Sequence, residues 1–133
     1  MTLECINPND LPIPEMYTQV VVATGSKLVF VSGQQPEDIN GKLVGHGDFA
    51  AQARLAFGNL GRALAAAGAR PERVCKITIY IVDPRYREPV YRVVGNWLKG
   101  VYPVSTGLVI SALARPEWLV EIDVIAVVPD TAL

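Results

Sequence analysis

The sequence is poor in the residues that hold metals or form disulfides. Its 133 residues include two cysteines, Cys5 and Cys75, and a single histidine, His46. The two cysteines are far apart and match no metal-binding or redox spacing, as expected of reduced thiols in a cytoplasmic protein. His46 stands between two glycines, without clustered partners for a catalytic triad or a metal site. No glycine pattern of a phosphate-binding loop is present either. We therefore expect neither a metal nor a cofactor.

The sequence also lacks an excess of charge of either sign. Charged residues make up 19% of the chain and the formal net charge is −1. The arginines are scattered and are not interleaved with aromatic residues, so electrostatic attraction to a polyanion is weak. We expect no nucleic-acid partner.

Long hydrophobic runs are absent as well. No apolar run approaches the roughly 20 residues that span a bilayer, and no basic-then-apolar leader is visible, so no membrane partner is expected. Yet 50% of the residues are hydrophobic, which is high for a soluble domain of this length. The sequence thus predicts a single domain over residues 1–133 that buries its excess apolar surface in a cytoplasmic homo-oligomer.

Two amphipathic helices are predicted. Asp48 is a good N-cap for a helix over 48–67, in which apolar residues recur every three or four positions until Gly68. A second helix is predicted from about 86 to 99, with Gly100 after its end.

Alternation of apolar and polar residues predicts the strands. The predicted segments are a hairpin of 17–23 and 27–32 joined by Thr24-Gly25-Ser26, a central strand 73–82, and a second hairpin-like pair of 108–112 and 119–128. Residues 1–15 contain three prolines and are expected to form an arm without an element of its own. In the last strand, one face is wholly apolar, whereas the other begins with Glu121 and Asp123 and continues with Ile125 and Val127. We expect this second face to be left uncovered by the helices and to pack against copies of the chain.

Three motifs, Ser32-Gly33-Gln34, Tyr102-Pro103 and the segment LARPEWLVEI over 113–122, resemble those of the RidA/YjgF family of reactive intermediate deaminases. The resemblance covers nearly the whole chain. It implies an α+β, chorismate-mutase-like fold in the order ββ(β)αβαββ, with two helices packed on one face of a mixed sheet. It also implies a homotrimer that binds a small-molecule ligand in clefts between subunits.

The resemblance assigns roles to three residues. Glu121 matches the glutamate that holds the water attacking an imine carbon, and Tyr17 matches a tyrosine that lines the cleft from a neighbouring subunit. Gly33 ends a strand, where the lack of a side chain lets a ligand approach the backbone. Each has an ordinary alternative: a solvated charge for Glu121, a strand-edge tyrosine for Tyr17, and a bend for Gly33.

Two positions depart from the family pattern. Ser105, followed by Thr106, stands where the family carries its substrate-binding arginine, and Glu88 falls by spacing where many members carry an asparagine. The cleft has thereby lost a carboxylate clamp and gained a negative charge, while Ser105 and Thr106 offer hydroxyl groups.

These departures change the expected chemistry. We expect weak or absent deaminase activity on 2-imino acids, and an imine or enamine without a carboxylate as the substrate. Arg85, Arg87 or Arg115 could supply a replacement guanidinium. The rival interpretation is a non-catalytic ligand-binding or interaction protein; the endoribonuclease activity ascribed to some relatives is the least favoured, because a basic surface is missing.

Overall fold

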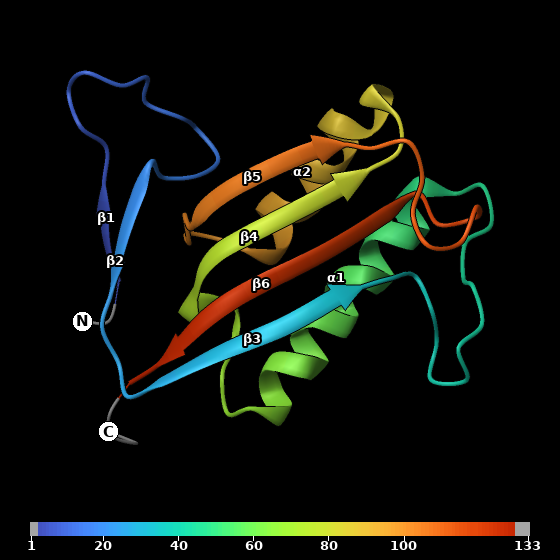
Figure 1. Cartoon of the computed structure of the whole chain (residues 1–133), viewed down its shortest axis with the longest axis horizontal. Coiled ribbons are helices and arrows are strands. Elements are labelled where there is room, and N and C mark those ends of the chain that lie inside the picture. The colour runs from blue at the N-terminus through green and yellow to red at the C-terminus, as the bar shows by residue number, and fades with distance from the viewer. Residues whose placement is uncertain (1–2, 130–133) are drawn as a thin grey trace.

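The computed structural model describes residues 3–129. Its elements are β1 (Leu3–Ile6), β2 (Val20–Ala23), β3 (Lys27–Gln34), α1 (Phe49–Ala66), β4 (Val74–Ile81), α2 (Arg87–Trp97), β5 (Val104–Val109) and β6 (Val120–Val128). Short 3-10 turns precede β4 and α2. Figure 1 shows both helices behind one face of a four-stranded sheet, with β1 and β2 beside the end of that sheet.

The sheet has the order β3-β6-β4-β5. β6 runs antiparallel to both of its neighbours, whereas β5 runs parallel to β4, with α2 as the connection between those two strands. The last strand of the chain therefore lies inside the sheet, and the expected α+β fold with a mixed sheet and two helices on one face is confirmed.

The two helices begin and end close to the predicted residues. Asp48 caps α1, because its side chain accepts a hydrogen bond from the backbone N–H of Ala51 over 3.1 Å. Gly68 follows the helix with a φ of 74°, a left-handed conformation that glycine adopts without strain. The apolar residues of both helices belong to one buried core that also includes residues of β4 and β6, and the rings of Phe57 and Trp97 join the two helices at a centre-to-centre distance of 5.2 Å.

Gln52 and Asn59, both on α1, fix the loops that lead to the candidate site. The fully buried amide of Gln52 donates to the carbonyls of Gly45 and Glu117 and accepts from the N–H of Leu119, two residues before Glu121. Asn59 donates to the carbonyls of Gln35 and Glu37, in the segment that follows β3. The contacts of both residues are structural.

The predicted pairing of the last two strands was wrong. β5 ends at Val109 and pairs along its length with Lys76–Ile81 of β4, so it does not form a hairpin with β6. The loop after β5 carries the chain across β4, and β6 then pairs with β4 along one edge and with β3 along the other. A period of two indicates which face a side chain joins but carries no information about the neighbouring strand.

The predicted N-terminal hairpin was also wrong. β2 is shorter than expected and pairs with β1, a strand that falls in the segment expected to lack an element. We call residues 3–23 the arm and residues 24–26 the hinge. At the hinge, the N–H of Ser26 donates to the carbonyl of Val128, and the arm then crosses the end of the sheet toward β5 (Figure 1). There the N–H of Thr18 donates to the carbonyl of Pro103 over 3.1 Å.

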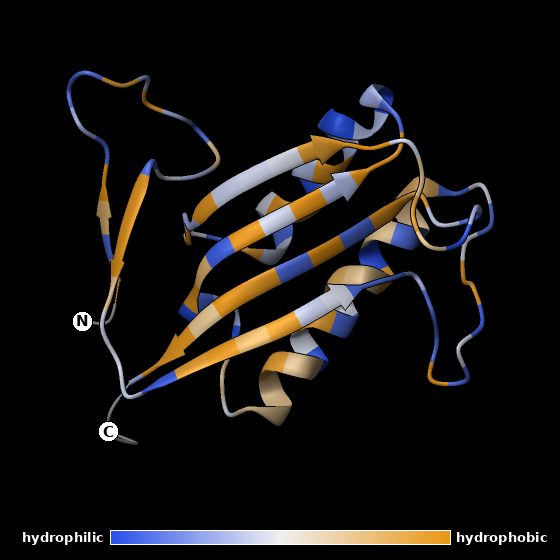
Figure 2. Ribbon diagram, viewed as in Figure 1, coloured by the Kyte–Doolittle hydropathy of each residue, from blue (hydrophilic) through white to orange (hydrophobic). Residues whose placement is uncertain are grey.

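Hydrophobic and hydrophilic residues both occur along the strands of the sheet (Figure 2). The register places Phe30 of β3 and Glu121 of β6 on the sheet face away from the helices, here called the open face. Leu28 and Phe30 of β3 are 64% and 70% exposed. Val127 was expected on this uncovered face, but it is only 1% exposed because the hinge glycine Gly25 lies against it. No helix within residues 3–129 has the length and apolar character needed to cross a membrane.

Candidate functional site

The candidate residues fall into two groups on opposite faces of the sheet. Glu121 and Gly33 lie together on the open face, and Tyr17 and Ser105 lie together on the side of α2. The strand register explains the separation. Glu121 of β6 pairs with Tyr80 of β4, and both side chains lie on the open face. Ser105 of β5 pairs with Ile77 of β4, whose side chain is buried under the helices. A single chain therefore cannot bring Glu121 and Ser105 to one small ligand.

Glu121 is fitted closely against Gly33. A β-carbon on Gly33 would lie 2.7 Å from the Cδ atom of Glu121 and would overlap its carboxylate oxygen Oε2. The side chain of Glu121 is half-buried in β6. The bulge between Val31 and Gln34 brings the end of β3 to this position. The absence of a side chain at residue 33 thus creates the space that the carboxylate occupies.

A tyrosine and a second carboxylate adjoin this group. The hydroxyl of Tyr80 donates to Oδ2 of Asp123 over 3.1 Å. Desolvation raises the pKa of Tyr80, and the hydrogen bond that its hydroxyl donates to Asp123, together with the charges of Asp123 and Glu121, raises it further. Tyr80 therefore stays a neutral hydrogen-bond donor at physiological pH. The open face thus carries two carboxylates of β6, those of Glu121 and Asp123.

The second group lines a partly enclosed pocket of about 260 Å³ between the arm, α2 and β5. Tyr17, Arg87, Tyr91 and Ser105 supply its polar groups. Its remaining wall consists of Ile79, Ile81, Val90, Gly107, Leu108 and Val109. An apolar wall with a few convergent polar groups is typical of a small-molecule site.

Ser105 contributes a hydroxyl that lacks a partner. Its Oγ atom is buried and has no hydrogen-bond partner within the described residues. Leaving a buried polar group unsatisfied typically costs about 1–3 kcal/mol, so such a group is usually explained by a water, an ion or a ligand. Because Ser105 lines the pocket, a water or ligand bound in the pocket can supply the missing hydrogen-bond partner.

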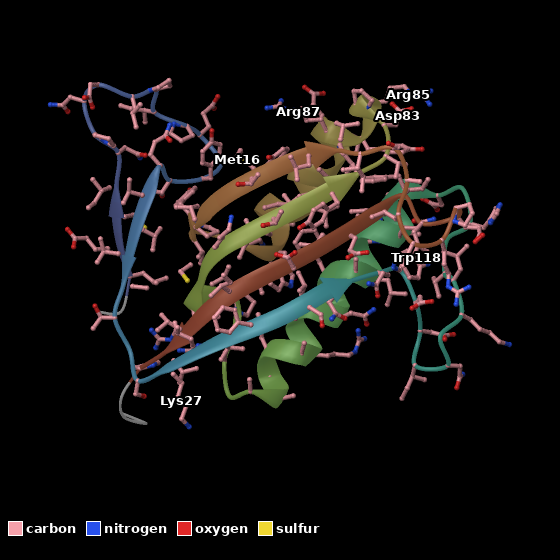
Figure 3. The ribbon with its side chains drawn as sticks, viewed as in Figure 1. Met16, Lys27, Asp83, Arg85, Arg87 and Trp118 are labelled. Atoms are coloured by element: carbon pink, nitrogen blue, oxygen red, sulfur yellow. The ribbon has the colours of Figure 1, made fainter. Side chains whose placement is uncertain are left out.

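The three arginines considered as replacements for the family's arginine have different surroundings, and Figure 3 labels two of them, Arg85 and Arg87. Arg85 forms a two-point ion pair with Asp83, at 2.8 and 3.1 Å, which lowers the pKa of Asp83 and raises that of Arg85. Arg115 lies 3.8 Å from a carboxylate oxygen of Glu37. Arg87 instead lies over the ring of Tyr91, 5.6 Å from its centre, and lines the pocket. Of the three, Arg87 alone reaches the pocket and, over residues 3–129, has no carboxylate at ion-pair distance.

The remaining two candidates lie outside this pocket. Glu88 is exposed and lines a separate, more open hollow of about 540 Å³, which shares Tyr17, Arg87 and Tyr91 with the pocket. Thr106 pairs with Thr78 in the register of β5 and β4, so it faces the opposite side of the sheet from Ser105. A hollow of about 670 Å³ between α1 and residues 34–39 contains none of the candidate residues.

Two residues of the pocket were missed in the sequence. Tyr91 follows Arg87 by four residues and shares its side of α2. Gly107 follows Ser105 by two residues, and a β-carbon there would lie 2.9 Å from the hydroxyl oxygen of Tyr91. The spacing of four residues between Arg87 and Tyr91 on the helix, and of two between Ser105 and Gly107 on the strand, could have indicated that these residues line the same pocket. Within the described residues, no three histidine, cysteine or acidic side chains gather as a possible metal site.

Comparison with known proteins agrees with this architecture. The sequence profile of the family described as endoribonuclease L-PSP matches residues 9–128. Protein DfrA of Myxococcus xanthus is 37% identical over 111 residues, which cover 84% of each chain. The crystal structure of the Rid family protein YyfB from Yersinia pestis is 30% identical and has a TM-score of 0.89, with 96% of this chain and 100% of YyfB covered.

A second Rid family protein from Yersinia pestis, YyfA, is 29% identical and has a TM-score of 0.72, with 95% of this chain and 99% of YyfA covered. Matches of this extent, to the family profile and to solved structures of the same fold, cover the helices, the mixed sheet and the candidate residues from Tyr17 to Glu121. The chain therefore belongs to the RidA/YjgF family.

Proposed function

We propose that this protein binds a small metabolite in the pocket of Tyr17 and Ser105 and hydrolyses a carbon–nitrogen double bond in it. The observation that carries the proposal is the pocket itself, which gathers a guanidinium, two tyrosines and an unpartnered serine hydroxyl against an apolar wall. Membership in a family of reactive intermediate deaminases supports the reaction class.

The proposed site is completed by a second copy of the chain. Glu121 and Ser105 lie on opposite faces of one sheet, so a cleft containing both must form between subunits. The exposed Leu28 and Phe30 on the open face give the apolar surface that such an association would bury. We propose the homotrimer that the family resemblance implies, in the cytoplasm as the sequence predicts.

In the proposed reaction, Glu121 orients a water molecule toward the imine carbon. Its carboxylate accepts a proton from the water as the carbon–oxygen bond forms, and the proton then passes to the nitrogen. The carbon–nitrogen bond breaks next, as Glu121 takes the proton of the new hydroxyl and passes it to the departing nitrogen, so that ammonia leaves and a carbonyl product remains. An enamine would first take up a proton at carbon to give the imine. The space that Gly33 leaves free allows the carboxylate to hold its position against β3.

The preferred substrate follows from residue 105. Losing one partner of a buried charge pair typically costs about 2–5 kcal/mol. At about 1.4 kcal/mol per tenfold, 2-imino acids should be processed roughly 30- to 3,000-fold more slowly than by an enzyme that keeps the arginine. An imine or enamine lacking a carboxylate makes no use of that arginine. Arg87 is the alternative cation, since it lines the pocket without an ion-pair partner in the described chain.

The test is the rate of ammonia release from imines generated in the cuvette. An amine oxidase supplies an imine without a carboxylate, and an amino-acid oxidase supplies 2-imino acids. We expect the protein to accelerate hydrolysis of the first substrate and Glu121→Gln to abolish the acceleration, while Ser105→Arg gains activity on the second. Full activity of the natural protein on 2-imino acids would refute the substrate assignment. No acceleration of either reaction, even by Ser105→Arg, would favour the rival, a non-catalytic binding protein.

A further inference from the structure

The position of the arm leaves two complementary strand edges without partners. A three-residue loop containing glycine between β2 and β3 is typical of a hairpin, in which consecutive strands pair with each other. In the described residues, β2 instead pairs only with β1, and β3 pairs only with β6. One edge of β2 and one edge of β3 therefore present free backbone N–H and C=O groups.

The side chains at both edges are apolar and exposed. Val20 and Val22 of β2 are 40% and 47% exposed, and Leu28 and Phe30 of β3 are 64% and 70% exposed. An isolated two-stranded hairpin is marginally stable in water, so the arm needs a further surface to pack against. Apolar strand edges of this kind invite pairing with another chain.

The arm is held away from β3 of its own chain by contacts at its far end. Thr18 is only 3% exposed and donates its N–H to the carbonyl of Pro103 at the start of β5. The methyl group of Met16 lies against Gly95 of α2, where a β-carbon would be 3.1 Å away. Because residues 16–18 are docked on β5 and α2, residues 20–23 cannot at the same time lie along β3 of the same chain.

The hinge fits this open arrangement. The N–H and hydroxyl groups of Ser26 donate to the carbonyls of Val128 and Pro129, over 3.0 and 3.3 Å. Gly25 packs so closely on β6 that a β-carbon would be 2.6 Å from a methyl group of Val127 and would overlap the carbonyl oxygen of Val128. The hinge is thus fastened to the end of β6, and the direction in which the arm leaves the sheet is fixed there.

We propose that the arm is exchanged between subunits: β2 of one copy pairs antiparallel with the free edge of β3 in a second copy of this chain. The pairing gives hydrogen-bond partners to the free backbone groups of both strand edges. It also brings the exposed side chains of Val22 and Leu28 into contact. Each subunit gives its arm to one neighbour and receives an arm from another, a head-to-tail contact that forms a ring of identical subunits when the rotation between neighbours closes. Tyr17 remains in the pocket of its own chain, in contrast to the neighbouring-subunit position that the family resemblance implies.

Disulfide trapping tests the exchange. A three-residue loop within one chain would place Val22 of β2 opposite Leu28 of β3, and the proposed exchange keeps this register between chains, at a separation that a disulfide can bridge. The experiment uses the full chain with Cys5→Ser and Cys75→Ser, to which Val22→Cys and Leu28→Cys are added. After mild oxidation, exchange predicts covalently linked chains on a non-reducing gel. The two single-cysteine variants serve as controls and should give at most a trace of linked dimer.

A longer hinge supplies the second measurement. Inserting three glycine or serine residues after Gly25 lets the arm fold back on its own β3, and we expect the same cysteine pair then to close within one chain. Two outcomes would overturn the proposal. One is an intrachain disulfide with the natural hinge, and the other is failure of the cysteine pair to oxidise with the natural hinge while it oxidises with the long one.

Discussion

Glu121 occupies space that a side chain at Gly33 would fill. The overlap involves the carboxylate, at the mobile end of a flexible side chain, and leaves the backbone of β6 untouched. The relationship therefore concerns the position of one functional group more than the stability of the sheet. It also links two residues on different strands, β3 and β6, whose proximity depends on the bulge near the end of β3.

Gly33→Ala should displace the carboxylate without unfolding the protein. We expect the melting temperature to change by only a few degrees, because the glutamate can rotate away, while imine hydrolysis falls at least tenfold since general base catalysis depends on position. Gly61→Ala is a matched control, because a β-carbon there would make an ordinary contact of 3.8 Å with Trp97. An unchanged rate in Gly33→Ala would argue against Glu121 as the base.

Glu121→Gln keeps the shape of the side chain and removes its basicity. A positioned general base typically contributes 10²- to 10⁴-fold to a rate, so we expect a loss of about that size in ammonia release with little change in melting temperature. Asp123→Asn is the control on the same strand and face, where an amide oxygen can still accept the hydrogen bond of Tyr80. If the two variants lose activity equally, the open face as a whole, and no single carboxylate, supports the reaction.

The sequence predicted the helices and the faces of strands better than the strand partners. Asp48 and Gly68 mark the ends of α1 because caps depend on local chemistry. The insertion of β6 between β3 and β4 depends on contacts far apart in the chain, which a local pattern does not encode.

For the candidate site, too, the sequence predicts the face on which a side chain lies and does not predict which side chains meet. A period of two already implies that Ser105 and Thr106 point to opposite faces, as the register of β5 shows. The proximity of Gly33 to Glu121, and of Tyr17 to Ser105, arises from tertiary packing and could not be derived from spacing.

Arg87→Gln tests whether the pocket accepts carboxylates. If Arg87 holds the carboxylate of a bound 2-oxo acid, such as 2-oxobutyrate, the dissociation constant measured by calorimetry should rise about 3- to 30-fold, a modest change because the side chain is exposed. Arg85→Gln is the control, since Arg85 is paired with Asp83 outside the pocket. Equal affinities for both variants and the natural protein would leave a neutral ligand as the better assignment.

Gln52→Leu should destabilise the fold through the loops that lead into α1 and β6. The buried amide makes three hydrogen bonds, with Gly45, Glu117 and Leu119, and leucine would leave those backbone groups unsatisfied. We expect a loss of about 2–4 kcal/mol in the free energy of unfolding, measured by urea denaturation. A loss below about 1 kcal/mol would mean that water replaces the amide. Gln52→Glu, of similar size, would show whether the shape alone suffices.

Asp83 should give the protein part of its acid sensitivity. The hydrogen bond from the side chain of Arg85, together with that from its backbone N–H, lowers the pKa of Asp83 below the ordinary value of 3.8. Because the pKa is lower in the folded state, the ionised carboxylate stabilises the fold above about pH 4, and this contribution is lost as the pH falls through the folded-state pKa.

Asp83→Asn should therefore lower the free energy of unfolding slightly at pH 7 and weaken its dependence on pH below about 4. The effect is small, since the pair is exposed and screened by salt. Urea denaturation at pH 7, 4 and 3 measures it, and Asp10→Asn, an exposed carboxylate of the arm, provides the control. If Asp83→Asn kept the full pH dependence of the natural protein, the acid sensitivity would have to come from other carboxylates.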